Sequence, residues 1–559
     1  MRLFRGASTA DEDQKKFIDS CMKHICMFRQ KSRKCSIQSG LFLLCILVLF
    51  SQTAIAISER LSGPSTDFEL AVSPISKSYL PPPGIMPIVV LQGEPYQMGY
   101  QYALQADEYI AIVRDAAWAS ALSKNNSTEI RQSCRAYREY ISKEMPQFDF
   151  SSFFQGMTDG MKDLGYAFGP DDPLVMLYWG GRQGPEPPDH CTAIAAFGNT
   201  TNGSVIAGTN FDYYHLPSNA YSIILVLYPK VGHSCIIPSG AGRTGSNFAF
   251  NSEGLVYIVA AGSQKGPGDS GPGITGFLEL PYTAMTCKFV PEAESFLVNS
   301  TRMFGLNHLL LDAYGNATVL EATRARYASR RSGDNNESDY LVVTNHYLHP
   351  KMKPSQPIWD PRQYYPSSYY RYLTAEKTIV DRQGEFNYST VVRMFSLTDW
   401  WDGKQWHYDD LKSTNTINRF RPDVATYYSA IAMPCEDRVS ICTGNPGTSR
   451  WGNLAPGQMG AYVNLTLAEG PDEMVFGLKK DASAAMWKTL QVMGDESPES
   501  ALDLWAAAMD SYWQAVWWMD RAILEGNESA KATSWGRSAS GFAEVVLQAE
   551  AVSKICATN

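Results

Sequence analysis

The feature that most constrains the fold is a change of sequence pattern at residue 191. Before it, apolar residues recur at helical spacing, most clearly between Pro95 and Ser123. A Gly- and Pro-rich segment, Gly180 to Pro188, then leads into short β-branched and aromatic runs that extend from Thr192 to Leu320. These runs are separated by Gly and Asn turns, so they predict a mainly antiparallel sheet that begins directly after the loop.

A hairpin prediction places a cysteine at the start of this sheet beside a carboxylate. Two strand candidates, Thr192–Gly198 and Ser204–Asn210, flank a turn that contains the Asn-Gly pair typical of hairpins. If Thr200–Gly203 form the loop, antiparallel pairing puts Cys191 opposite Asp212, with both side chains on one face. A shift by one pair still leaves them neighbours. A carboxylate about 5 Å from the first residue of a strand is placed to orient an α-amino group.

Hydrophobic spacing predicts further elements on both sides of this hairpin. The tail from Ala482 is expected to be helical, and its Trp-rich stretch to pack in the core. The other predicted elements are a strand over Pro87–Leu91 and helices over Pro95–Ser123, Ile130–Met145, Pro291–Phe304 and Tyr369–Asp381.

Six motifs in order resemble those of the penicillin acyltransferase-like peptidases (the C45 group) within the N-terminal-nucleophile hydrolases. The resemblance covers most of Pro87 to Asn464. In chain order the motifs are Gly93 to Gln101, Cys191-Thr192-Ala193, Asn210-Phe211-Asp212, Asn251 to Leu255, Thr344 to Tyr347, and Ser367 to Tyr372.

This resemblance implies an α+β fold, the four-layer αββα sandwich, with an added C-terminal helical segment. It also implies that the His190–Cys191 bond is broken by the cysteine's own thiol, which leaves a small N-terminal and a large C-terminal subunit. A freed α-amine has a pKa of about 7.7 to 8.0 and can act as base to a thiol near 8.5. The thiol then attacks an amide carbonyl, and water or an amine resolves the thioester.

Three catalytic residues follow from the motifs. By resemblance, Cys191 is the nucleophile, Asp212 aligns the α-amine, and Asn345 donates its side-chain amide to the oxyanion. One position departs from the pattern, because His190 stands where many relatives carry glycine. Either an imidazole assists the acyl shift, or processing is slow or absent.

The N-terminal region predicts entry into the secretory pathway. Leu41 to Phe50 is an unbroken apolar run behind a basic segment, and Ala54-Ile55-Ala56 resembles a signal-peptidase site. The alternative is a type II signal anchor with the basic tail in the cytosol, the membrane being reached only through this segment. A lysosomal, extracellular or membrane-anchored lumenal enzyme is expected.

Sequons and cysteines agree with translocation. Apart from Cys191, six cysteines follow the apolar run, an even number for disulfides, and Cys435 with Cys442 is the favoured pair. The potential glycan acceptors are Asn125, Asn126, Asn199, Asn202, Asn299, Asn316, Asn336, Asn387, Asn464 and Asn527.

Composition and motif context exclude several classes of function. A formal net charge of −9 offers no basic surface for nucleic acid. Gly240 to Gly245 matches a nucleotide-binding spacing but precedes strand-like sequence instead of a helix, and His346 with His349 lacks a third metal ligand. We therefore expect neither a cofactor nor a metal ion.

The predicted function is hydrolysis of a C–N amide bond in a small acylated amine, amino acid or peptide. An N-acyltransferase is the close alternative, and an unprocessed, non-catalytic lumenal binding glycoprotein is the alternative from another class. The predicted divisions are a basic leader (1–38), a signal or anchor (39–57), a linker (58–84), a small-subunit part (85–190), a catalytic domain (191–468) and a helical extension (469–559).

Overall fold

The computed structural model describes residues 86–178, 191–214, 221–408, 410, 413–419, 424–446, 462–467, 470–494 and 497–558. The chain divides into two units, Met1–Ile75 and Ser76–Asn559, and every described residue belongs to the second. His190 and the predicted leader, apolar segment and linker lie outside the described residues.

The first sheet has eight strands, and its edge strand β1 is buried on both faces. Val89 and Leu91 pack in the core beneath the helices, and Ile88 and Val90 are buried on the opposite face. This two-sided burial accounts for the continuous apolar run in the sequence. β1 pairs in parallel with β4 and the remaining pairs are antiparallel. The order is β1 (Ile88–Gly93), β4 (Ser222–Pro229), β5 (Cys235–Gly240), β6 (Phe248–Asn251), β7 (Val256–Ala261), β8 (Leu306–Leu311), β9 (Ala317–Ala322) and β10 (Tyr327–Arg330).

The second sheet has six strands and is antiparallel throughout. Its order is β11 (Tyr340–Val343), β2 (Cys191–Ala196), β3 (Ile206–Tyr214), β14 (Val424–Met433), β15 (Arg438–Thr443) and β16 (Tyr462–Thr466). A separate two-stranded ladder joins β12 (Trp400–Trp401) to β13 (Trp406–His407).

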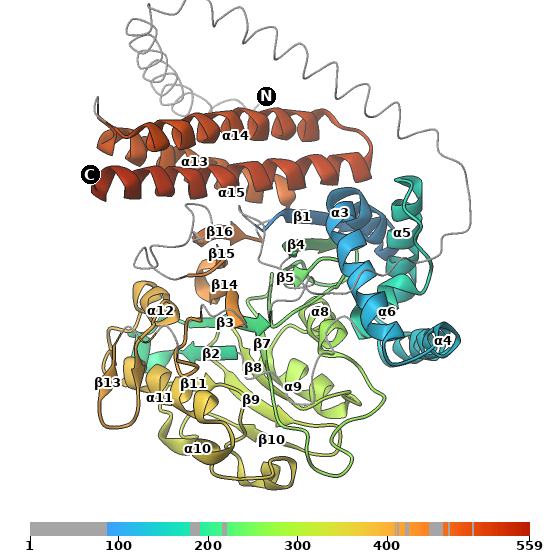
Figure 1. Cartoon of the computed structure of the whole chain (residues 1–559), viewed down its shortest axis with the longest axis vertical. Coiled ribbons are helices and arrows are strands. Elements are labelled where there is room, and N and C mark those ends of the chain that lie inside the picture. Colours follow the sequence, from blue (N-terminus) through green and yellow to red (C-terminus); the bar gives the residue numbers. More distant parts are fainter. Residues whose placement is uncertain are drawn as a thin grey trace, which may run out of the picture. The chain divides into compact units, whose positions relative to one another are not determined.

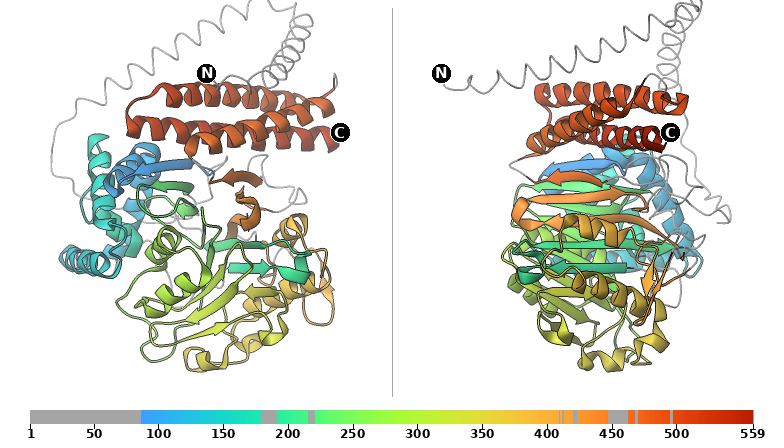
Figure 2. Two further views of the ribbon diagram at one scale, coloured as in Figure 1. Left: turned by 180° about the vertical axis from the view of Figure 1, so that it is seen from behind. Right: turned by 90° about the vertical axis from the view of Figure 1, so that its left-hand side faces the viewer.

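The sheets stack face to face, and helices cover both outer faces (Figures 1 and 2). β2 and β3 of the second sheet lie against β7 of the first, and these contacts join the two sheets in the middle of the sandwich. The four-layer αββα arrangement expected from the resemblance is therefore confirmed. The first sheet is covered by α3 (Pro95–Leu122), α8 (Gly276–Thr286) and α9 (Val290–Asn299), with α4 (Ser127–Glu144), α5 (Phe150–Asp163) and α6 (Asp172–Tyr178) packed around α3. The second is covered by α11 (Pro366–Val380), which follows the short α10 (Pro361–Tyr364), and by α12 (Tyr388–Phe395).

Three C-terminal helices form a further layer against the edge strands β1 and β16 (Figure 1). They are α13 (Pro471–Val492), α14 (Glu499–Leu524) and α15 (Glu528–Thr558). α14 packs on α15 through small residues, and a Cβ added at Gly541 would meet the Ala515 side chain at 2.8 Å. The prediction that the Trp-rich stretch packs in the core is wrong for Trp513 and Trp517. They are 49% and 54% exposed because they lie on the outer side of the α14–α15 pair.

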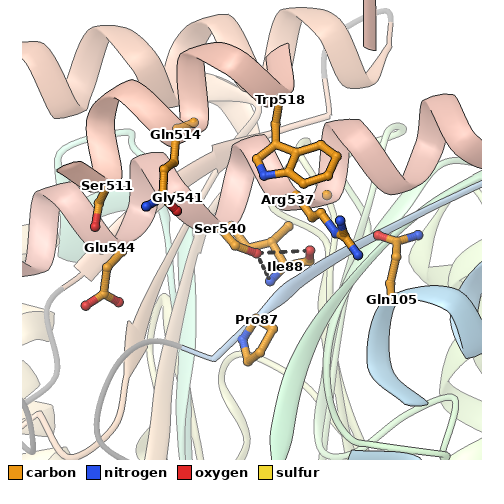
Figure 3. A pocket seen from close by; sticks show the side chains of 12 residues that line it. Pro87, Ile88, Gln105, Ser511, Gln514, Trp518, Arg537, Ser540, Gly541 and Glu544 are labelled. Carbon is orange, nitrogen blue, oxygen red and sulfur yellow. Dashed lines mark hydrogen bonds between the residues drawn. The ribbon is translucent and has the colours of Figure 1, made fainter. Parts of the chain in front are cut away.

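Side chains complete the hydrogen bonding of the β1 edge. The Ser540 hydroxyl of α15 accepts a hydrogen bond from Ile88 N at 2.8 Å and donates to Ile88 O at 3.2 Å (Figure 3). A cavity of about 380 Å³ lies beside this contact, between α14, α15 and β1. The same two-way bonding recurs along the strand, with Gln105 serving Val90 and Gln101 serving Gln92.

The predicted disulfide between Cys435 and Cys442 is wrong, because all seven described cysteines are unpaired. Cys435 is exposed in a 3₁₀ helix, and its sulfur lies 3.3 Å from the Ala313 carbonyl oxygen. Cys442 is buried in β15, where burial raises the pKa of its thiol. Separately, no helix in the described ranges combines the length and apolar character needed to cross a membrane.

Candidate active site

Cys191 is the first residue of β2, between β11 and β3 in the second sheet. Its side chain is buried, with 6% of the residue exposed. On the β11 side, Val343 pairs with Ala193, so the antiparallel register continued by two residues places Asn345 opposite Cys191. The backbone N of Cys191 donates to Asn345 Oδ1 at 3.1 Å. The structure therefore brings two of the three predicted catalytic residues into direct contact.

On the β3 side the predicted register is wrong by one residue. Cys191 pairs with Phe211, not with Asp212. The last pair of the hairpin is Ala196 with Ile206, because residues 198–201 form a 3₁₀ helix that lengthens the loop. Successive side chains on a strand point to opposite faces, so the Asp212 side chain lies on the face opposite that of Cys191.

Asp212 nevertheless stays close to Cys191 through its backbone. Its N–H hydrogen-bonds the sulfur, and its negative charge helps to raise the pKa of the thiol. The carboxylate is fully buried; it accepts from Thr426 Oγ1 at 2.6 Å and lies 3.6 Å from Arg419 Nε.

Asn345 is oriented by an arginine that the sequence motifs did not single out. Its Oδ1 also accepts from Arg371 Nη2 at 2.8 Å, and its Nδ2 donates to Ala261 O at 2.9 Å. A guanidinium is only a donor, so this contact fixes which side-chain atom is the oxygen. The Asn345 amide NH₂ thus points to a backbone carbonyl in this structure, whereas its oxygen faces the Cys191 nitrogen.

Arg371 connects α11 to strand β2. It is fully buried, and its Nη1 donates to the Cys191 carbonyl oxygen and to Thr192 Oγ1, the latter at 3.0 Å. Ser368, three residues earlier on the helix, accepts from Asn345 N at 2.7 Å. Polar residues at positions 367, 368 and 371 share one helical face, and this i, i+1, i+4 spacing was the available signal.

Asn247 is the second residue that sequence reasoning missed. It precedes β6, and its Nδ2 lies 3.8 Å from Cys191 Sγ and donates to Thr209 Oγ1 at 3.1 Å. Its Oδ1 accepts from the Tyr428 hydroxyl at 2.6 Å, so the amide group is held with its donors toward the sulfur. No spacing in the sequence links residue 247 to 191, because the contact is made only when the two sheets stack.

The thiol of Cys191 is neutral near pH 7. Burial is the largest cause and, with the Asp212 charge, raises its pKa to about 12, although Arg371 and the Asn247 amide lower it. Within the described residues, no imidazole or carboxylate hydrogen-bonds this sulfur. An effective nucleophile at this position therefore needs a base that is not found among the described residues.

A comparison with known protein families matches a residue range that contains most of this site. The family described as acyl-coenzyme A:6-aminopenicillanic acid acyl-transferase matches residues 199–447, a range that holds Asp212, Asn247, Asn345 and Arg371 but not Cys191. An uncharacterized protein of Archaeoglobus fulgidus is 22% identical over 344 residues, which are 53% of this chain and 55% of the relative. The chain thus spans about half the length of that relative.

Similar solved structures include three hydrolases. An N-acylethanolamine-hydrolyzing acid amidase ortholog of Caenorhabditis elegans is 13% identical, with a TM-score of 0.30 over 44% of this chain and 93% of that one. Penicillin V acylase from Agrobacterium tumefaciens is 13% identical, with a TM-score of 0.31 over 50% and 87%. A variant of the conjugated bile acid hydrolase from Clostridium perfringens is 11% identical, with a TM-score of 0.33 over 50% and 93%.

The order of the motifs and the sequence match point the same way. Residues 199–447 of this chain are similar to the family described as acyl-coenzyme A:6-aminopenicillanic acid acyl-transferase.

Proposed function

We propose that this chain is a cysteine amide hydrolase of the N-terminal-nucleophile, peptidase C45-like type, matured by cleavage of its His190–Cys191 bond. The observation that carries the proposal is that side chains hydrogen-bond both backbone polar groups of Cys191. Asn345 accepts from its nitrogen and Arg371 donates to its carbonyl oxygen, so two buried side chains fix the main chain of one cysteine. Cleavage before residue 191 turns that nitrogen into an α-amine already held near the sulfur.

The proposed maturation begins with attack of Cys191 Sγ on the carbonyl carbon of His190. The peptide C–N bond breaks as a thioester forms, and the nitrogen takes a proton to become the α-amine. Water then hydrolyses the thioester, which leaves a carboxylate on His190 and a free thiol on Cys191. β1 pairs with β4 along its whole length, which supports continued association of the two fragments after the cut.

Turnover repeats the same chemistry on a small N-acyl substrate. The α-amine, with an ordinary pKa of about 7.7 to 8.0, takes the thiol proton as sulfur attacks the amide carbonyl. Asn247 Nδ2 lies 3.8 Å from the sulfur and suits the oxyanion, where loss of one donor typically costs about 2.7 to 4 kcal/mol. Asn345 then holds the amine, the Asp212 N–H stays at the sulfur, and water releases the acyl group from the thioester.

An acyltransferase remains the second candidate, because the matched family is described as an acyl-transferase. The difference lies in whether water or an amine resolves the thioester. A competing amine added to the assay separates the two outcomes: transfer product in place of free acid would replace hydrolase by transferase.

The proposed location is the secretory pathway, with the catalytic part lumenal, lysosomal or extracellular. Eight of the ten sequon asparagines are exposed, and only Asn125 and Asn464 are half-buried. This accessibility supports glycosylation, which peptide-N-glycosidase treatment and a gel shift would test.

Replacing the nucleophile tests the enzyme proposal directly. We expect wild-type protein to yield a large fragment with Cys191 at its N-terminus and Cys191→Ala to remain intact and inactive, because the variant lacks the attacking sulfur. N-terminal sequencing, denaturing gels and a panel of N-acyl substrates provide the readouts. Cys235→Ala is the matched control, since it removes another fully buried strand thiol and should mature normally.

The same experiment decides between an enzyme and the non-catalytic alternative. An intact wild-type chain that binds acylated amines without hydrolysing them would favour a binding glycoprotein. Undiminished cleavage and turnover in Cys191→Ala would contradict the mechanism outright.

A further inference from the structure

A buried ion cluster lies beside the segment that carries Asn345. Arg330, at the end of β10, is 2.9 Å from Glu321 Oε1 through its Nε and also pairs with Glu337 Oε2 through its Nη1. The three side chains are between 0% and 3% exposed. We call these residues the Glu–Arg–Glu triad.

The triad holds the chain before Asn345. Glu337 Oε1 accepts from Val342 N at 2.8 Å, and Arg330 Nη2 donates to Val342 O at 3.0 Å. Both backbone polar groups of one residue, three positions before Asn345, are therefore bound by the same charged cluster.

The triad also holds the chain after Asn345. Glu321 accepts from Leu348 N at 3.0 and 3.1 Å through its two oxygens, and from His349 N at 2.9 Å. Since Arg330 joins Glu321 to Glu337, the two ends of the segment from 342 to 349 are fixed to each other through one guanidinium.

A third contact reaches the helix that supplies the site arginine. The Tyr372 hydroxyl donates to Glu337 Oε1 at 3.2 Å, and Tyr372 directly follows Arg371 on α11. The triad thus touches every segment that positions a polar group around the Cys191 backbone, without touching Cys191 itself.

The chemistry of the triad argues against a purely structural role. An arginine and two carboxyl groups are costly to bury, and burial raises the pKa of Glu337 to about 7 in spite of the Arg330 charge. Apolar residues of similar volume often stabilise a fold as well or better. A planar guanidinium, however, fixes two carboxylates and a carbonyl in one geometry that no apolar group reproduces.

We propose that Arg330 is a positioning residue of the active site, and that the Glu–Arg–Glu triad sets the placement of Asn345 and Arg371 around the Cys191 nitrogen. This inference rests on the proposed amide hydrolase function. Misplacement of a site by about 1 Å can cost up to about 100-fold in rate, so a loosened triad lowers kcat. KM stays near the wild-type value because the triad does not contact the substrate-facing sulfur.

The principal test variant neutralises the whole triad as Glu321→Gln, Arg330→Met and Glu337→Gln. It keeps side-chain volume and leaves no unpaired buried charge, so we expect it to fold. The expected result is a kcat at least about 10-fold lower with KM within about twofold. Arg330→Lys, which keeps the charge but not the fork, should give an intermediate kcat. Glu321→Gln alone serves if the triple variant does not fold.

Amide hydrogen exchange supplies a readout that does not depend on activity. The amides of Val342, Leu348 and His349 should exchange faster in the triple variant than in wild type. Arg326→Met is the control, because it removes a different arginine pair, with Asp269 at 2.5 Å, and should leave kcat and these amides unchanged.

The outcomes separate the two proposals. Wild-type kcat and wild-type exchange in the folded triple variant would overturn the positioning role. Faster exchange with unchanged kcat would also overturn it, since the Glu–Arg–Glu triad would then have only a structural role. If wild-type protein hydrolyses no amide at all, the proposed function fails. Unchanged exchange in the triple variant would separately show that the triad does not hold the segment from 342 to 349.

Discussion

Two buried polar clusters in this protein differ in how completely their polar atoms are paired. In the Glu–Arg–Glu triad, every carboxylate oxygen and every guanidinium nitrogen has a hydrogen-bond or ion-pair partner. Glu279, on helix α8 at the outer face of the first sheet, is equally buried, yet no donor among the described residues reaches either carboxyl oxygen.

The α8 cluster is consequently built from neutral groups. Burial raises the pKa of Glu279 to about 8, against the opposing charge of Arg302. Nearby, the Tyr257 hydroxyl and His308 Nδ1 are 2.6 Å apart, and burial lowers the pKa of His308 well below its usual value. Near neutral pH this cluster therefore holds a protonated acid and an uncharged imidazole.

The difference shows that burial of a titratable group does not by itself indicate a role in the site. What distinguishes the triad is complete pairing, directed at the segments that carry Asn345 and Arg371. The α8 cluster lies among helix α8 and strands β7 and β8. No hydrogen bond among the described residues joins it to the segments that carry Asn345 and Arg371.

The largest effect should come from removing only the central charge of the triad. Arg330→Met leaves two carboxylates buried without their partner, so the free energy of unfolding should fall by about 3 to 5 kcal/mol. Urea unfolding at pH 7 measures this. The neutral triple variant should regain most of the lost free energy of unfolding. An Arg330→Met protein as stable as wild type would contradict the view that pairing distinguishes the triad from the α8 cluster.

A smaller effect of opposite sign is expected at Glu279. Its folded pKa, about 8, exceeds the ordinary value of 4.5, so its contribution to stability is present below pH 4.5 and is lost as pH rises through 8. Glu279→Gln should be stabilising by on the order of 3 kcal/mol at pH 7 and close to neutral at pH 4. Melting temperatures of both proteins between pH 4 and 8 test this. Parallel curves would show that Glu279 titrates normally.

The smallest effects come from matched tyrosine substitutions, one in each cluster. Tyr372→Phe should cost about 1 kcal/mol, because Glu337 Oε1 keeps the Val342 N–H. Tyr257→Phe should cost about 2 to 3 kcal/mol, because His308 loses its hydroxyl partner and its Nε2 already lacks one among the described residues. Urea midpoints with equal slopes provide the comparison, and the reverse order would contradict it.

Local elements could be predicted from the sequence where periodicity was strong. The helices expected over 95–123 and 130–145 appear as α3 and α4, and the strand over 87–91 as β1. The tail helix begins at Pro471, earlier than the expected residue 482, because a Pro at the first helical position is itself compatible with a helix start. The stacking of the sheets came from the family resemblance, since spacing carries no information on how two sheets face each other.

Site residues could be predicted only where they belong to short sequence motifs. Cys191, Asp212 and Asn345 are predicted from their motifs, but the predicted register is wrong because the 3₁₀ helix after Phe197 lengthens the hairpin loop. Asn247, Arg330 and Arg371 were missed for a physical reason. The contacts of Asn247 and Arg371 with residue 191 join positions 56 and 180 apart, and no local spacing in the sequence links such distant positions.

The closure of the β1 edge has a consequence for where this protein can be shortened. A chain ended after β16 would lose Ser540 and the helix layer, and would bare the Ile88 backbone and the apolar residues beneath α15. Exposed strand edges invite pairing with other molecules. Helix α15 therefore takes the place of a neighbouring strand at this edge, and a chain shortened after β16 is expected to lose solubility.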